Sequence, residues 1–292
     1  MADRKIMVTG ASSCLGGLVV SLLRLLEGVE VAAYGHQELD ILDEERLRAV
    51  LAEEKPATVI NCAGFNDVIA AEHDQAVKLE VNTRGACNLA RAATDFHFYL
   101  CLFSSKHVFN GKQAEPYGIG DELWPENQYG HSQQAAEEMT ANLTKNFLIL
   151  RRDYLFGFAD DGIALIRERL GRGEPLEVAE DYYFAPTYIG DLAAAMVMLA
   201  GEWAAGTYHY TNDAGADGVS CYEFARTVAV ELGLDADLLQ PKPRTEIDFG
   251  YPINLPERAI LSLDSLREIF PALVRPWRES LREYLAQFGA AK

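Results

Sequence analysis

The first 157 residues alternate short apolar runs with amphipathic helical stretches, and no other feature of the sequence constrains the fold as strongly. Strands are expected at 5–10, 29–35, 57–64, 98–105 and 146–157, and helices at 14–28, 43–56, 74–96 and 127–144. Strands this apolar are buried on both faces, as in a parallel sheet covered by helices. The pattern therefore predicts an α/β fold with a doubly wound parallel sheet and a ligand at the carboxyl ends of its strands.

The alternation loosens after residue 157, where nothing builds a second alternating sheet. We therefore expect two lobes, with the chain crossing between them more than once. The predicted dinucleotide-binding domain comprises 1–157 and about 186–212, and the smaller C-terminal substrate lobe comprises about 158–185 and 213–292.

The net charge of −18, from 26 basic and 44 acidic residues, argues against one class of partner. Such a surface repels phosphate backbones, so no nucleic acid is expected to bind. No apolar run reaches the roughly 18 residues of a membrane span, and the first residues lack the layout of a signal peptide. The five cysteines are scattered and form no CxxC pair, which is typical of reduced thiols. We expect a cytoplasmic protein with no membrane contact.

The stretch TGASSCLGG, residues 9–17, lies where a Rossmann-type fold has its phosphate-binding loop. Gly10 and Gly16 can make the tight turn and the close helix packing. The middle glycine, however, is replaced by Ser13 or Cys14, depending on the spacing chosen. If that position requires a positive φ, the replacement costs roughly 1–3 kcal/mol of strain. The loop is therefore either a cofactor site or a turn that is now only structural.

The end of the second strand usually carries the residue that distinguishes NAD from NADP. Here Tyr34, Gly35 and His36 supply neither the acid typical of NAD sites nor a clear cation for a 2′-phosphate. Asp40, six residues after Tyr34, is the acid we expect near the cofactor. The choice between NAD and NADP stays open.

A serine and a tyrosine lie where a carbonyl-reducing site would need them. Ser105 closes the fourth predicted strand, and Tyr129 opens the following helix, where it can donate a proton as hydride arrives. A lysine four residues later would help the tyrosine, but this position is Gln133. Lys106 is a possible substitute, although adjacent strand residues point to opposite faces. The structural alternative for Tyr129 is packing at a helix start. The scattered His107 and His131 do not predict a metal site.

Motifs along nearly the whole chain resemble the extended short-chain dehydrogenase/reductases, and among them the dTDP-4-dehydrorhamnose reductase family. The matching stretches include TGASSCLG, ELDILDEE, VINCAG, EVNTRGACNLARAA, SSKHVFNG, NQYGHSQ, APTYIGDLA and YEFARTVAVELG. The same branch includes the regulatory beta subunit of methionine adenosyltransferase.

The resemblance implies an NAD(P)H-dependent reductase of a 4-keto sugar nucleotide. Ser105 and Tyr129 would be catalytic, and Tyr154 would contact the substrate. The cofactor would lie against a set of loop and strand-end residues: Gly10, Ser13, Cys14, Leu15, Gly16, Asp40, Ile41, Gly64, Phe65, Asn66 and Gln133.

The chain departs from the family pattern at the middle loop glycine, Ile69, Lys106, His107 and Gln133. Two further functions therefore stay open. One is a non-catalytic regulatory subunit that binds a dinucleotide, a sugar nucleotide or a partner enzyme subunit. The other is an enzyme whose chemistry does not need the lysine. A homodimer is an expectation from the family alone.

Overall fold

The computed structural model describes residues 4–72, 79–247 and 253–288. Its contacts divide the chain into two compact units. Unit 1 comprises residues 1–108, 123–151 and 193–208, and unit 2 comprises 109–122, 152–192 and 209–292. The units interleave along the sequence, as the two predicted lobes do. Two boundaries differ from the prediction: segment 109–122 belongs to unit 2, and the later segment of unit 1 spans 193–208 instead of about 186–212.

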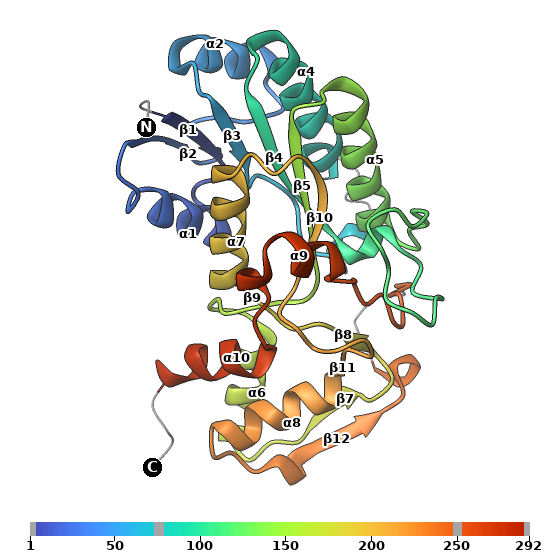
Figure 1. Ribbon diagram of the computed structural model, residues 1–292. Coiled ribbons are helices and arrows are strands. Elements are labelled where there is room, and N and C mark those ends of the chain that lie inside the picture. Colours follow the sequence, from blue (N-terminus) through green and yellow to red (C-terminus); the bar gives the residue numbers. More distant parts are fainter. Residues whose placement is uncertain (1–3, 73–78, 248–252, 289–292) are drawn as a thin grey trace. The chain divides into compact units, whose positions relative to one another are not determined.

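Unit 1 is built on a six-stranded sheet with the order β10-β5-β4-β3-β1-β2 (Figure 1). The strands are β1 (Arg4–Thr9), β2 (Val29–Tyr34), β3 (Thr58–Asn61), β4 (Tyr99–Ser105), β5 (Phe147–Arg152) and β10 (Gly206–Tyr210). β1 pairs in parallel with both β2 and β3, and β3 pairs in parallel with β4. The predicted α/β fold with a doubly wound parallel sheet is confirmed.

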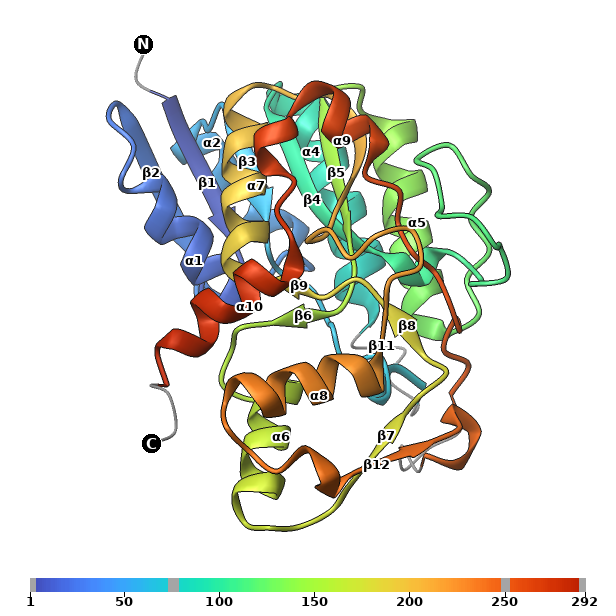
Figure 2. The same ribbon diagram turned by 60° about the horizontal axis from the view of Figure 1, so that its bottom comes forward.

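Helices cover both faces of this sheet, as the figures show (Figures 1 and 2). One face carries α2 (Glu44–Glu54), α4 (Ala86–Phe96) and α5 (Gln128–Leu143), and the other carries α1 (Cys14–Leu23) and α7 (Ile189–Gly201). The core on the first face joins strand residues such as Met7 and Val59 to Leu47 of α2 and Leu89 of α4, all fully buried. Burial on both faces explains why these strands are continuous apolar runs.

The chain reverses its direction across the sheet at β1, because β2 lies on one side of it and β3 on the other. Such a reversal opens a crevice at the carboxyl ends of the two central strands, where doubly wound sheets bind ligands. Gly10 and Cys62 follow β1 and β3 directly and therefore meet at this crevice.

Three predicted elements differ from the observed ones. α1 ends at Leu23 instead of Gly28, with Arg24 as its C-cap. Gly28 lies in the turn before β2 and has a φ of +73°. The predicted strand 146–157 breaks after Arg152, because the buried carboxylate of Asp153 accepts the N–H groups of Tyr154 and Ala185. Of the helix predicted over 74–96, residues 74–78 lie outside the described residues. Its described part passes through a π-helical turn, Val81–Gly85, into α4.

Unit 2 has an aromatic core and three short strand pairs. β6 (Leu155–Phe156) pairs with β9 (Thr187–Tyr188), β7 (Leu176–Ala179) with β12 (Leu239–Lys242), and β8 (Tyr183–Phe184) with β11 (Val219–Ser220). Its helices are α6 (Gly162–Gly171), α8 (Cys221–Glu231), α9 (Asp264–Ile269) and α10 (Trp277–Ala286). Phe156, Phe184, Phe224 and Trp277 lie in one buried cluster between them.

Candidate functional site

Two glycines fix the turn between β1 and α1. Gly10 has a φ of +64°, and a Cβ on it would overlap the backbone of Cys62 and Ala63. A Cβ on Gly16 would overlap the carbonyl oxygen of Gly10. The close approach of α1 to the ends of β1 and β3 therefore requires glycine at both positions.

The two non-glycine residues in the middle of the loop are not strained. Ser13 is the N-cap of α1, with φ −73° and ψ 160°, and its Oγ accepts the N–H of Gly16 at 3.0 Å. Cys14 begins the helix and has no positive φ. The position therefore needs no positive φ, and the expected strain of the replacement is absent. Serine is instead a favoured N-cap residue.

The N-terminus of α1 keeps hydrogen-bonding capacity for an anion. Within the described parts of the chain, the backbone N–H groups of Cys14 and Leu15 donate no hydrogen bond. Free N–H groups and the helix dipole together favour a phosphate at such a terminus. A cavity of about 470 Å³ opens beside this loop. Its described walls are Gly10, Ser12, Ser13, His36, Asp40, Leu42, Cys62, Ala63, Gly64, Phe65 and Val81. A cavity of this volume is in the range of small-molecule and cofactor pockets.

The cavity wall includes five residues of the predicted cofactor set: Gly10, Ser13, Asp40, Gly64 and Phe65. Ile41 differs, because its side chain is 1 % exposed and packs on Gly85, and its carbonyl accepts the Nδ2 donor of Asn88. Cys14, Leu15, Gly16, Asn66 and Gln133 are likewise not part of the wall.

Asn82, which sequence reasoning missed, holds the segment after β3 in place. Its Oδ1 accepts the N–H of Phe65 at 2.8 Å, and its Nδ2 donates to the carbonyl of Phe65 at 2.9 Å. The same amide donates to Ser132 Oγ, which in turn donates to the carbonyl of Tyr129. One buried amide thus ties a wall of the cavity to the helix that carries Tyr129. The hint in the sequence is an asparagine within a helix-like stretch that also carries the family resemblance.

The two serines at the end of β4 have different roles. Ser104 donates to Glu137, whose carboxylate also forms a buried ion pair with Arg151 at 2.7 Å. This network is closed, because the carboxylate is bonded from both sides. Ser105 Oγ instead accepts the backbone N–H of His107 at 3.3 Å. Within the described residues its own proton has no acceptor, so Ser105 is the serine that can donate to a ligand.

His107 contacts both predicted catalytic residues. Besides its bond to Ser105, its ring lies edge-on to Tyr129, with ring centroids 5.6 Å apart. Gly130 permits this approach, since a Cβ there would overlap the carbonyl oxygen of His107. Asn127, the N-cap of α5, accepts the N–H of Gly130 with Oδ1 and therefore presents Nδ2 to His107 Nδ1 at 3.1 Å. This arrangement assigns the proton of neutral His107 to Nε2.

Tyr129 is buried at the start of α5. It is 1 % exposed and packs with Phe65, Val68, Ala71 and Leu79. Its hydroxyl lies 3.4 Å from Asn66 Oδ1, so the structure brings Asn66 to Tyr129. A ligand that is to accept a proton from Tyr129 must take the place of Asn66 at this hydroxyl.

Gln133 and Lys106 occupy the two positions at which, from the sequence, a charge could assist Tyr129. Gln133 lies one helical turn after Tyr129 and is 6 % exposed, and its side chain forms no hydrogen bond with the described residues. Lys106 begins a 3₁₀ turn, Lys106–Val108, and is 1 % exposed. Because β4 ends at Ser105, the strand alternation used to place Lys106 on the opposite face does not apply, and that premise was wrong.

Tyr154, the predicted substrate contact, lies in unit 2. Its ring packs on Phe184 with centroids 4.6 Å apart and on Phe224 at 5.8 Å, and burial raises its pKa. Its hydroxyl fills the space beside Gly162, where a Cβ would overlap it. The position is that of a packed aromatic residue, and its contact with substrate stays a prediction.

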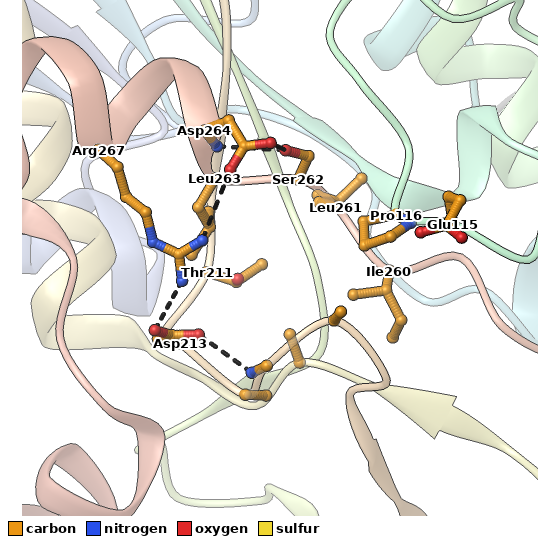
Figure 3. A pocket seen from close by; sticks show the side chains of 14 residues that line it. Glu115, Pro116, Thr211, Asp213, Ile260, Leu261, Ser262, Leu263, Asp264 and Arg267 are labelled. Atoms are coloured by element: carbon orange, nitrogen blue, oxygen red, sulfur yellow. Dashed lines mark hydrogen bonds and ion pairs between the residues drawn. The ribbon is translucent and has the colours of Figure 1, made fainter.

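Another cavity, of about 340 Å³, lies in unit 2 and is shown in Figure 3. Thr211, Asp213, Ile260, Ser262 and Arg267 are among its described walls. The Arg267 guanidinium is 2.7 Å from Asp213 and 3.7 Å from Asp264, so its charge is already balanced within the wall.

None of the helices in the described parts of the chain has the length and apolar composition needed to cross a membrane. The described residues also contain no group of three or more His, Cys, Asp or Glu side chains that could hold a metal ion.

Comparison with known proteins gives full-length matches. The family model of the RmlD substrate binding domain matches residues 4–290. The chain is 33% identical over 287 residues to a dTDP-4-keto-6-deoxy-D-glucose reductase of Streptomyces niveus, covering 97% of this chain and 96% of that protein. It is 32% identical over 292 residues to the spore coat polysaccharide biosynthesis protein SpsK of Bacillus subtilis, covering 98% and 99%.

A solved structure agrees with these relatives. The dTDP-4-dehydrorhamnose reductase of Bacillus anthracis in complex with NADP matches with a TM-score of 0.90 and 26% identity, covering 98% of this chain and 100% of that one. The resemblance drawn from the motifs is thus confirmed: the chain belongs to the RmlD substrate-binding domain family, among the dTDP-4-dehydrorhamnose reductase relatives.

Proposed function

We propose that this protein is an NAD(P)H-dependent reductase of a nucleotide-linked 4-keto-6-deoxy sugar. One observation supports the proposal: His107 neighbours both residues of the predicted catalytic pair, because its backbone N–H donates to Ser105 Oγ and its ring lies edge-on to the ring of Tyr129. The relatives named as reductases are matched over nearly their full length.

The cofactor would lie in the cavity beside the glycine loop. The N–H groups of Cys14 and Leu15 would hold the diphosphate, and Gly10 and Gly64 would let the backbone approach it. When bound, the nicotinamide supplies a hydride to the carbonyl carbon of the sugar.

The protein's own residues would complete the reduction. Ser105 would donate its free proton as a hydrogen bond to the carbonyl oxygen and polarise the carbonyl. Tyr129 would transfer its phenolic proton to that oxygen, so that the C=O group becomes CH–OH, and the phenolate would regain a proton from water. Tyr129 would first exchange its contact with Asn66 for the substrate oxygen.

The test is oxidation of NADH or NADPH by the purified protein with dTDP-4-keto-6-deoxyglucose, followed by identification of the sugar product. UDP-linked and GDP-linked 4-keto sugars would serve as a comparison panel. We expect cofactor oxidation that depends on the keto sugar. Oxidation of NADH or NADPH without formation of a reduced sugar would contradict the proposal.

Gln133 favours a second candidate, a regulatory subunit that binds the dinucleotide or sugar nucleotide without turnover. A glutamine supplies no charge to Tyr129, and its side chain has no hydrogen bond within the described residues. Cofactor binding with no reduction of any sugar in the panel would support this candidate. Association with a partner enzyme subunit and formation of a homodimer stay predictions, which light scattering and co-purification would test.

A further inference from the structure

The position directly after β2, where a cofactor-selecting residue is usually found, is a glycine and has no side chain. β2 ends at Tyr34, and the next residue is Gly35. Tyr34 turns away from this role, because its hydroxyl donates to Glu54 at 2.5 Å. Neither residue can therefore contact the adenosine ribose with a carboxylate.

A carboxylate from further along the chain occupies this space. Glu38 folds back, and its Oε2 accepts the N–H of Gly35 at 2.5 Å. A Cβ built on Gly35 would lie 3.0 Å from Glu38 Oε2 and 3.0 Å from Ser12 Oγ. The carboxylate of Glu38 thus lies where a side chain of residue 35 would begin, next to the glycine loop.

The turn that carries Glu38 is fixed at both ends. The N–H groups of Glu38 and Leu39 both donate to the carbonyl of Gly35, at 3.1 and 3.0 Å, and the Leu39 side chain is buried. Within the described parts of the chain, Oε1 of Glu38 accepts no hydrogen bond, so it can accept one from a ligand. Ser12, whose Oγ lies near the same point as this carboxylate, lines the cavity.

From this geometry we propose that Glu38 accepts hydrogen bonds from the adenosine ribose hydroxyls and makes the protein selective for NADH over NADPH. A carboxylate at the end of the second strand binds the free 2′-hydroxyl and repels a 2′-phosphate. This inference rests on the proposed function, because it requires a dinucleotide in the cavity.

The surrounding charges act in the same direction. Glu38 lies beside the wall and is not part of it, whereas Asp40 lines the cavity and adds a second carboxylate. Arg84 reaches the carbonyl of Leu42, but its guanidinium also forms an ion pair with Glu80 at 3.3 Å. His36 is the remaining basic side chain among the described residues of the wall.

The experiment is calorimetric titration of the full-length protein with NADH and with NADPH, in the wild type, Glu38→Gln and Glu38→Ala. We expect the wild type to bind NADH about 10- to 100-fold more tightly than NADPH. The carboxylate accepts a hydrogen bond from the ribose of NADH, whereas it repels the 2′-phosphate of NADPH. Both variants should bind NADH more weakly and NADPH more tightly, so that the ratio falls toward one. Glu45→Gln, which removes the same charge from the exposed surface of α2, should leave the ratio unchanged.

The outcomes separate this inference from the proposed function. Equal affinities in the wild type, or tighter binding of NADPH, would overturn the role of Glu38 while leaving the reductase intact. A preference for NADH that persists in both variants would assign the selectivity to another residue. Failure of both cofactors to bind the wild type would instead overturn the proposed function.

Discussion

The glycine loop and the Tyr129 site both depart from the family pattern, but the structure answers the two departures differently. In the loop, Ser13 or Cys14 stands in place of a glycine; neither has a positive φ, and Ser13 caps α1 with a φ of −73°. At the second site, Gln133 replaces a lysine and no bond of its side chain to the described residues takes over the lysine's task. The first change keeps the geometry, whereas the second removes a charge.

This difference shows which replacements a scaffold tolerates. A position selected for backbone conformation accepts a new residue if the conformation is open to any residue, as it is at Ser13. A position selected for charge requires that charge or a substitute for it. We therefore expect cofactor binding to persist more fully than the rate of reduction.

The largest effect is expected for Tyr129→Phe. Loss of the proton donor should lower kcat by about 10²- to 10⁴-fold. Because the contact of the tyrosine hydroxyl with Asn66 is long, 3.4 Å, the fold should persist and the Kd for NADH should change little. Steady-state kinetics and calorimetry measure the two quantities. An unchanged kcat would assign proton donation to another group.

The next effect is a gain, expected for Gln133→Lys. A cation one turn after Tyr129 would stabilise the phenolate left by proton transfer and should raise kcat by about 10- to 100-fold. Gln133→Met, similar in length but without charge, is the matched control and should not raise kcat. If the lysine variant is no faster than the wild type, the missing charge does not limit this enzyme.

A smaller effect is expected for stability in the glycine loop. Gly10→Ala should lower the free energy of unfolding by about 1–3 kcal/mol, because it forces a positive φ on alanine and overlaps the backbone of Ala63. The control is Gly17→Ala, whose new Cβ would make only an ordinary contact, 3.7 Å from the carbonyl oxygen of Ala11. That helical substitution should stabilise α1 by about 0.5–1 kcal/mol. Urea denaturation compares both, and equal effects would contradict the close approach at Gly10.

The smallest effect is expected for thiol labelling beside the loop. Burial raises the pKa of Cys62 to about 12, so that only about one molecule in 10⁴ carries its thiolate at pH 8. Cys14 is exposed at the start of α1 and should react with iodoacetamide much faster. NADH should slow the labelling of Cys14 several-fold, as read by peptide mass spectrometry, and Cys14→Ser should remove the fast phase. Labelling of Cys14 that NADH does not slow would place the diphosphate elsewhere.

Much of the fold follows from local sequence patterns. The alternation of apolar strands and amphipathic helices predicts the doubly wound sheet, since burial on both faces imposes continuous apolar runs. The ends of elements are less predictable. The break after Arg152 depends on Asp153 accepting the N–H of Ala185, which is far away in the sequence.

The candidate site was predictable only in part. Ser105 and Tyr129 stand out because their residue types and spacing suit carbonyl chemistry. Asn82, His107 and Glu38 were missed for this role because each acts through a contact made by folding: Asn82 with Phe65, His107 with Tyr129, and Glu38 with Gly35. Glu38 shows the limit best, since it occupies the space of residue 35 from a position three residues later in the sequence.

The most direct test of hydride transfer is a reaction with NADH deuterated at C4 of the nicotinamide, using protein in molar excess over dTDP-4-keto-6-deoxyglucose. Mass spectrometry of the sugar detects even slow reduction under these conditions. We predict a product carrying one deuterium at the former carbonyl carbon with the wild type, and far less with Tyr129→Phe. Binding of both ligands with no deuterated sugar after prolonged incubation would contradict catalysis and identify a binding protein.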